Sequence, residues 1–109
     1  MIKEITQSEF DSMDHSRPML VEFYSKTCGP CKMLAFVLKE IDKAIPEFLI
    51  FQIDFDANME LKERFKVTGF PTMIFFKDGR EVERMEGLKQ KPTIVKVIGS
   101  LLFNCKQGE

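Results

Sequence analysis

Two of the three cysteines stand two residues apart in the segment KTCGPCK, residues 26–32. Cys28 and Cys31 could bind a metal, close a structural disulfide, or open and close that disulfide in a redox reaction. A structural zinc takes about four ligands, and Cys105 and the single histidine, His15, would complete such a set. These residues are scattered along the chain without a second close pair, which disfavours zinc. A structural bridge across so small a loop would stabilise the fold little, so the spacing favours thiol–disulfide exchange.

A strand-to-helix junction is predicted around these cysteines, with a buried apolar strand at Met19–Tyr24 and a helix at Lys32–Ile45. Free amide N–H groups and the helix dipole stabilise an anion at a helix start, so we expect a thiolate at Cys28. The thiolate is the form that attacks a disulfide. Cys31 follows one helical turn later, where its sulfur can resolve a mixed disulfide formed at Cys28.

The other predicted elements alternate between strands and helices. Strands are predicted at Ile2–Ile5, Met19–Tyr24, Phe48–Asp54, Thr72–Phe76 and Glu81–Met85, and helices at 7–15, Lys32–Ile45, Asn58–Phe65 and from Pro92 to about Asn104. The Asp78-Gly79 pair between the last two strands indicates a hairpin. Alternation with helices implies parallel strands, and the hairpin adds an antiparallel edge. The expected fold is therefore α/β, with a central mixed sheet of about five strands flanked by four helices.

Two of these helices carry apolar residues at helical spacing, which predicts that one face of each helix packs on the sheet. In the helix at Lys32–Ile45 the expected inward residues are Met33, Phe36, Val37, Ile41 and Ala44. In the last helix the expected inward residues are Ile94, Val95, Ile98, Leu101 and Leu102.

Length and charge narrow the classes of function. The chain has 109 residues, so one domain is expected over residues 1–109. The formal net charge is −1 and charges of both signs are interspersed, which argues against nucleic acid or an anionic membrane as a partner. No apolar run approaches the ~18–20 residues of a membrane span. Charged residues from Lys3 to Asp11 interrupt the region where a signal peptide would be apolar, so a cytoplasmic protein is expected.

In several motifs the chain resembles the thioredoxin family of small dithiol reductases, over residues 2–104. The shared motifs are VEFYSKTCGPCK at Val21–Lys32, VTGFPT at Val67–Thr72, the hairpin FFKDGR, and Gly87 after the last strand. The resemblance implies a thioredoxin fold and a protein disulfide reductase, or electron carrier, that uses reversible dithiol–disulfide exchange at residues 28–31. It also implies disulfide-containing protein substrates, a thioredoxin reductase as electron donor and no bound cofactor, and we expect a monomer.

The resemblance further assigns roles to individual residues. Cys28 resembles the attacking thiolate and Cys31 the resolving thiol. Pro71 matches a proline that the family holds in the cis form beside the dithiol, and Phe70 would offer backbone hydrogen bonds to an extended substrate segment. The expected docking face for substrates consists of Thr27, Gly29, Pro30, Phe70, Pro71 and Gly87.

Several positions depart from the family pattern. The family usually has tryptophan where this chain has Thr27, so a different substrate range is expected. It usually has proline where this chain has Phe36, so a straighter helix is expected. Glu22 and Gln52 stand where family members typically have a buried aspartate and a lysine.

Glu22 is the only ionisable residue within the predicted strand MLVEFY, apart from the terminal Tyr24. Burial is expected to raise the pKa of this carboxyl, and the neutral Gln52 is not expected to counter that shift. We therefore predict that Glu22 exchanges a proton with Cys31, directly or through water. The alternative is a carboxylate that reaches solvent past a strand edge.

Two functions of other kinds remain open. In the first, the fold is a binding module that docks on a partner enzyme, and the dithiol only keeps its face in shape. In the second, the protein is an oxidant or isomerase, which fits poorly because that function needs an exported chain and a destabilised disulfide. Cys105 is expected to be a passive thiol, His15 a solvated surface residue, and Asp54 and Asp56 capping or solvated carboxylates.

Overall fold

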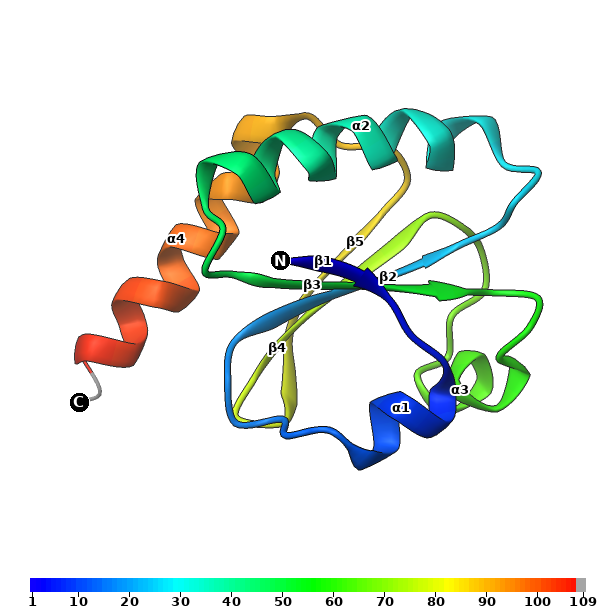
Figure 1. The fold of residues 1–109 in the computed structure, drawn as a ribbon, viewed down its shortest axis with the longest axis horizontal. Helices are drawn as coiled ribbons and strands as arrows, with labels where there is room; N and C mark the ends of the chain where they lie inside the picture. The colour runs from blue at the N-terminus through cyan, green and yellow to red at the C-terminus, as the bar shows by residue number, and fades with distance from the viewer. Residues whose placement is uncertain (108–109) are drawn as a thin grey trace.

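A five-stranded mixed sheet lies at the centre of the computed structural model, with helices on both of its faces (Figure 1). The structure describes residues 1–107, and the side chains of residues 1–103. In chain order the elements of this part are β1 (Ile2–Glu4), α1 (Gln7–Ser12), β2 (Met19–Tyr24), α2 (Gly29–Ala44), β3 (Leu49–Asp54), α3 (Met59–Arg64), β4 (Thr72–Lys77), β5 (Arg80–Glu86) and α4 (Lys91–Gln107). The predicted α/β class and the predicted order of strands and helices are therefore confirmed. None of the described helices combines the length and apolarity that a bilayer span requires.

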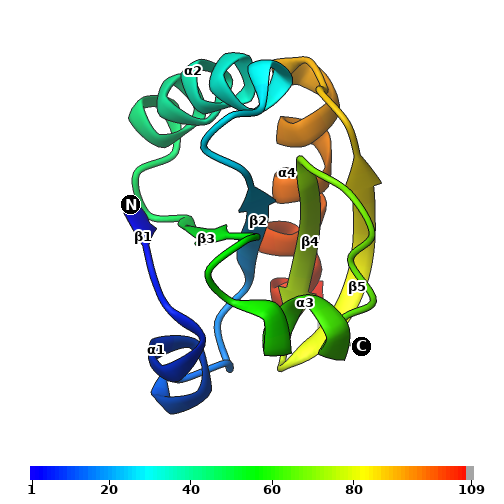
Figure 2. The same cartoon turned by 90° about the vertical axis from the view of Figure 1, so that its right-hand side faces the viewer.

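The strands lie in the order β1-β3-β2-β4-β5, so β2 occupies the middle of the sheet. β1, β3 and β2 run parallel, whereas β4 is antiparallel to β2 and β5 is antiparallel to β4. Figures 1 and 2 show α2 on one side of the sheet and α1 and α3 on the other. The end of β2 leads directly into the loop that carries the two cysteines.

Two apolar clusters fill the spaces between the sheet and its helices, and the alternation of side chains along each strand decides which residues join which cluster. Val21 and Phe23 of β2 pack on the side of α1 and α3. Leu20 of β2 packs on the side of α2 and α4, with the buried helix residues Leu34, Leu38, Ile41, Ile94, Ile98 and Leu101. Glu22 has the same parity as Leu20, so its side chain points toward α2. All the inward residues predicted for α4 are buried or half-buried.

The inward face of α2 differs from the prediction. The residues buried against the sheet are Cys31, Leu34, Leu38 and Ile41. Met33 and Phe36 are 59% and 70% exposed, Ala44 is exposed, and Val37 is half-buried. The buried stripe is shifted by about one residue from the predicted one, and both stripes have helical spacing. The apolar pattern alone therefore could not decide which of them faces the sheet.

A smaller difference concerns the end of α1, which lies at Ser12 rather than near residue 15. His15 beyond it is half-buried, with its ring centroid 4.6 Å from that of Phe10. Its Nε2 lies 2.7 Å from the carbonyl oxygen of Phe10. The prediction of a solvated surface residue was wrong, because the ring packs back on α1.

Candidate active site

The two cysteines lie where the loop after β2 turns into α2 (Figure 1). Cys28 is the N-cap residue of α2 and Cys31 lies in its first turn. A disulfide bond joins them, with a Cα–Cα distance of 5.2 Å. Pro30 also lies in the first turn, where its missing N–H leaves no helical hydrogen bond unmade. The local sequence therefore folds into a loop that brings the two sulfur atoms together.

The sulfur of Cys28 lies at the positive end of α2. The backbone N–H of Cys31 donates a hydrogen bond to Cys28 Sγ at 3.1 Å. No acidic residue occurs in the first turn of α2, so nothing there opposes a negative charge on this sulfur. Cys28 is 7% exposed and Cys31 is 4% exposed. When the disulfide is reduced, this position favours a thiolate at Cys28.

A second loop, between α3 and β4, lies against the dithiol. Its Phe70–Pro71 peptide bond is cis, the isomer that the family resemblance implies. The carbonyl oxygen of Phe70 lies 4.0 Å from Cys28 Sγ, and Phe70 is 41% exposed. Gly87, which follows β5 with a φ of 87°, donates its N–H to the carbonyl oxygen of Pro71 at 2.9 Å. The structure thus brings the predicted docking residues to one end of the molecule, with Thr27, Gly29 and Pro30 exposed beside the cysteines.

The turn after β3 holds the two acidic residues next to this end. The backbone N–H of Asp56 donates to Asp54 Oδ1 at 2.9 Å, and Lys26 Nζ lies 3.8 Å from Asp54 Oδ2. The hydroxyl of Ser25 donates to Asp56 at 3.3 Å. Asp54 is buried, and the N-cap residue of α3 is Asn58. The expectation of a helix-capping or solvated carboxylate was therefore wrong for Asp54, which instead closes the turn.

Glu22 lies in the central strand β2, which leads to the dithiol, between Gln52 of β3 and Met73 of β4. The residue is 0% exposed, so the alternative in which its carboxylate reaches solvent is wrong. Burial raises the pKa of Glu22 to about 7. Within the described part of the chain, Oε2 has no hydrogen-bond partner. The carboxyl therefore resists ionisation until the pH approaches neutrality.

Gln52 has more influence on this carboxyl than expected. Its Nε2 donates a hydrogen bond to Glu22 Oε1 at 3.0 Å. This bond favours the ionised form and partly offsets the effect of burial on the pKa of Glu22. Burial still prevails, because one neutral donor replaces only a part of the lost hydration.

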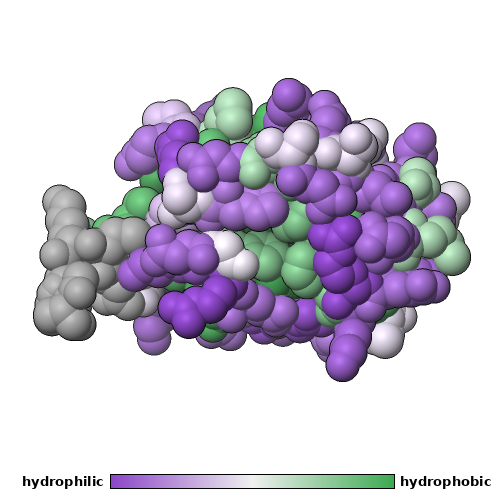
Figure 3. All heavy atoms as spheres, turned by 90° about the horizontal axis from the view of Figure 1, so that it is seen from below, coloured by the Kyte–Doolittle hydropathy of each residue, from purple (hydrophilic) through white to green (hydrophobic). Residues whose placement is uncertain are grey.

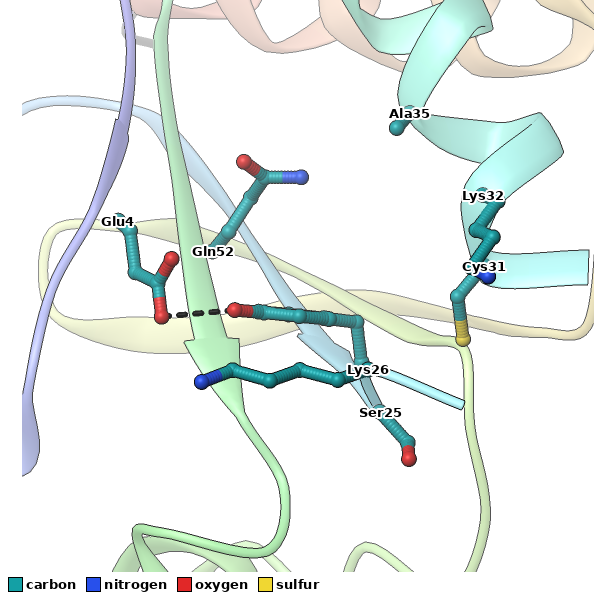
Figure 4. A pocket seen from close by; sticks show the side chains of 8 residues that line it. Glu4, Ser25, Lys26, Cys31, Lys32, Ala35 and Gln52 are labelled. Carbon is teal, nitrogen blue, oxygen red and sulfur yellow. Dashed lines mark hydrogen bonds between the residues drawn. The ribbon is translucent and has the colours of Figure 1, made fainter. Parts of the chain in front are cut away.

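A pocket of about 270 Å³ extends from the dithiol to the partner of Glu22. It is lined by Glu4, Tyr24, Ser25, Lys26, Cys31, Lys32, Ala35 and Gln52. Figure 4 shows Cys31, Lys32 and Ala35 on the side of α2, with Glu4 and Gln52 across the pocket from them. Tyr24 donates its hydroxyl to Glu4 Oε2 at 2.7 Å, and burial together with this carboxylate raises the pKa of that hydroxyl. Cys31 and Gln52 therefore line the same pocket.

The described residues contain no cluster of three or more side chains that could hold a metal ion. His15, which the zinc alternative required, contacts Phe10 instead. The side chain of Cys105, which completed that alternative and is also the predicted passive thiol, lies outside the described part of the chain.

A family model described as thioredoxin matches residues 1–100 of the chain. The chain belongs to the thioredoxin family. A thioredoxin from Chlamydia muridarum is 43% identical over 98 residues, which cover 90% of this chain and 96% of that protein. A bifunctional thioredoxin reductase/thioredoxin from Mycobacterium leprae is 36% identical over 104 residues, which cover 93% of this chain and 23% of that protein.

The fold of a solved thioredoxin agrees with this assignment. The X-ray structure of Fasciola hepatica thioredoxin matches with a TM-score of 0.82 at 30% identity, over 93% of this chain and 99% of that one. The protein is therefore a protein disulfide reductase and electron carrier that uses reversible dithiol–disulfide exchange between Cys28 and Cys31. In this family the redox-active cysteine pair, rather than a bound cofactor, carries the electrons.

Sequence reasoning missed two features of the site. One is Phe55, whose ring packs edge-on against Phe70. Its position directly after β3 was an available signal, because parallel strands bring their carboxyl ends to the same edge of the sheet. The other is the hydrogen bond between Tyr24 and Glu4 at the pocket. Nothing in the sequence indicates this bond, since β1 and β2 are separated in the sheet by β3.

Proposed function

We propose that Cys28 is the nucleophile that attacks disulfides of substrate proteins and that Cys31 is the resolving thiol. The observation that carries these roles is the placement of Cys28 Sγ at the start of α2, where it accepts the N–H of Cys31. A thiolate is favoured at such a position, and the thiolate is the attacking form. Cys31 is buried one turn further along, so its nearest target is the sulfur of Cys28.

The reaction takes two exchange steps. The Cys28 thiolate attacks one sulfur of the substrate disulfide, whose S–S bond breaks, and the departing sulfur takes up a proton. Cys31 then loses its proton and attacks Cys28 Sγ in the mixed disulfide, which releases the second substrate sulfur as a thiolate. Two electrons have passed from the dithiol to the substrate, and the Cys28–Cys31 disulfide is closed.

Glu22 accepts the proton of Cys31 in the second step, through water in the pocket. Its pKa of about 7 supports this role, because a base works best when its pKa lies near the working pH. Its side chain points toward α2, which carries Cys31, and its partner Gln52 lines the same pocket as Cys31. When the disulfide is reduced again, the same carboxyl returns the proton to Cys31.

Substrates dock on the exposed end of the molecule formed by Thr27, Gly29, Pro30, Phe70, Pro71 and Gly87. Phe70 and Pro71 directly precede β4, so an extended substrate segment beside them would pair with the backbone like an added strand. A disulfide in that segment would lie over Cys28, because the carbonyl oxygen of Phe70 is 4.0 Å from Cys28 Sγ.

A thioredoxin reductase supplies the electrons. The protein acts as a monomer in the cytoplasm, and residues 1–109 form one thioredoxin domain. The Mycobacterium leprae relative, which is named as a bifunctional thioredoxin reductase/thioredoxin, supports a thioredoxin reductase as the electron donor. A dithiol that must be reduced before it acts fits a reducing compartment. The formal net charge of −1 offers no broad attraction to nucleic acid or to an anionic membrane.

Reduction of insulin by dithiothreitol tests the roles of the two cysteines. Cys28→Ser is expected to abolish the catalysed rate. Reduced Cys31→Ser, mixed with insulin after the dithiothreitol has been removed, is expected to stop after the first step, with insulin held covalently at Cys28 and visible by mass spectrometry. Substrate trapped at residue 31 in Cys28→Ser would reverse the roles. Wild-type protein that binds a partner but does not accelerate insulin reduction would favour the binding module instead.

A further inference from the structure

Two aromatic rings pack on each other at the end of the molecule where substrates are proposed to dock, and the backbone of one of these residues approaches the reacting sulfur. Phe70 presents its carbonyl oxygen at 4.0 Å from Cys28 Sγ and leaves 41% of its surface exposed. The ring of Phe55 meets the ring of Phe70 edge-on, with centroids 5.1 Å apart and planes at 72°. Figure 3 shows a few hydrophobic side chains among hydrophilic ones at the right-hand end, where the loops after β2 and β3 lie in Figure 1.

Phe55 is held by a backbone hydrogen bond, by Lys62 over its ring and by packing against the core cluster on the side of α1 and α3, which makes it a fixed support for Phe70. Its backbone N–H donates to the carbonyl oxygen of Tyr24 at 2.7 Å. The ammonium group of Lys62 lies 4.7 Å from the centre of the Phe55 ring. Lys62 Nζ also lies 3.7 Å from the sulfur of Met59. A ring supported in this way loses less conformational freedom when a ligand packs on its neighbour, because it is already ordered.

The residue that precedes Cys28 in the chain, Thr27, is small and polar. Thr27 is exposed, and its hydroxyl oxygen lies 3.3 Å from that of Ser25. The backbone N–H of Thr27 also donates to Ser25 Oγ at 3.4 Å. Of these two neighbours of Cys28, Phe70 therefore brings an aromatic side chain and Thr27 does not.

We propose that Phe70, supported by Phe55, selects substrates that carry an aromatic or methionine side chain beside the cysteine that Cys28 attacks. This inference rests on the proposed function and adds the substrate class. The carbonyl oxygen of Phe70 lies 4.0 Å from Cys28 Sγ. Successive Cα atoms are only ~3.8 Å apart, so the residues next to a substrate cysteine that is bonded to Cys28 must lie near Phe70. Ring edges and thioether sulfurs pack favourably on an aromatic ring, beyond the area that they bury.

The test compares two synthetic peptides with the same disulfide, one with phenylalanine and one with alanine beside each cysteine. Fully reduced protein is mixed with each peptide in a single turnover, so that no reductase or dithiothreitol enters the measurement. Wild-type protein should reduce the phenylalanine peptide with a second-order rate constant about 3- to 10-fold higher. A methionine peptide should fall between the two.

Matched variants assign the preference to the ring pair. Phe70→Ala should bring the ratio of the two rate constants close to one, and Phe70→Leu, which keeps an apolar side chain, should lower it. Phe55→Leu should lower the ratio less than Phe70→Ala. Phe36→Ala is the control, because Phe36 is 70% exposed on the outer face of α2, outside the docking face, and should keep the wild-type ratio.

The outcomes separate this inference from the proposed function. Equal rate constants for both peptides in wild-type protein, or a ratio unchanged in both Phe70 variants, would overturn the aromatic selection while the dithiol reaction stands. Reduction of neither peptide by wild-type protein would overturn the proposed function itself. A loss of the ratio in Phe36→Ala would place the selecting surface on α2 instead.

Discussion

The dithiol follows the end of β2 and the carboxyl of Glu22 lies within that strand, yet their chemistry has different origins. Cys28 owes its reactivity to its own neighbours along the chain, since the helix start and the N–H of Cys31 are three residues away at most. Glu22 owes its raised pKa to segments far along the chain, because β3, β4 and α2 together bury it. A motif can therefore reveal the first kind of chemistry, whereas only the assembled sheet creates the second.

Removal of the buried proton acceptor, Glu22, should have the largest effect on the rate of the reaction. Glu22→Gln keeps the shape of the side chain and an acceptor for Gln52, but it cannot take up the proton of Cys31. The rate of the resolving step above pH 7 is expected to fall by about 100-fold. In wild-type protein this rate should rise with pH through an inflection near 7, as Glu22 ionises, and the variant should lack that inflection. Quenched-flow mass spectrometry of the mixed disulfide measures the rate of the resolving step and its dependence on pH. Superimposable pH profiles for wild type and Glu22→Gln would remove Glu22 from the mechanism.

The same substitution should stabilise the fold at alkaline pH. The pKa of Glu22 is about 7 in the folded protein against an ordinary value of 4.5, so between these values the folded state binds a proton that the unfolded chain has lost. The free energy of unfolding therefore decreases as the pH rises through this window, by about 3 kcal/mol in total. Glu22→Gln should unfold at a higher urea concentration than wild type at pH 8, and at a similar one at pH 4.5. Equal midpoints at pH 8 would show that burial of the carboxyl costs no stability.

Substitutions of Gln52 should shift the pKa of Glu22 while the carboxyl itself is kept. Gln52→Lys places an ammonium group where the amide now donates to Glu22, which favours the ionised form. The inflection in the resolving rate is then expected to move below pH 7, by about one unit. Gln52→Met is the matched control: it removes the hydrogen bond without adding charge, so the inflection should move upward. A shift in the same direction for both variants would contradict the role assigned to this hydrogen bond.

The lysines that flank the dithiol should have the smallest effect on the reactivity of Cys28. Lys26 and Lys32 are exposed, and salt screens such charges strongly. Lys26→Gln and Lys32→Gln should each change the alkylation rate of reduced Cys28 at pH 7 by less than about two-fold in 0.15 M salt. The difference should vanish in 1 M salt. A tenfold decrease would show that the thiolate depends on the lysines rather than on the helix start.

The part of the site that the sequence predicted is the part that local chemistry determines. The two cysteines mark the start of α2 because Pro30 and the preceding apolar run leave few alternatives. The hairpin between β4 and β5 follows from Asp78-Gly79, whose residues both have positive φ. These signals act over a few residues, so no knowledge of the remaining fold is needed to interpret them.

The part that the sequence did not predict depends on contacts between distant segments. The inner face of α2 was misassigned because two stripes, one with Leu34 and one with Met33, have the same spacing, and only packing on the sheet selects between them. The effect of Gln52 on Glu22 depends on the register of β2 and β3, which places the two residues side by side. The Phe55–Phe70 pair joins loops that only the sheet order brings together.

The middle position of β2 also limits how protons can move. This strand has partners along both edges, so it cannot open without breaking the ladders to β3 and to β4 at once. Its backbone amides should therefore belong to the slowest hydrogen-exchange class of the molecule. Protonation of Glu22 must then occur within the intact native state, through side chains and the pocket beside it, on a timescale far shorter than that of unfolding.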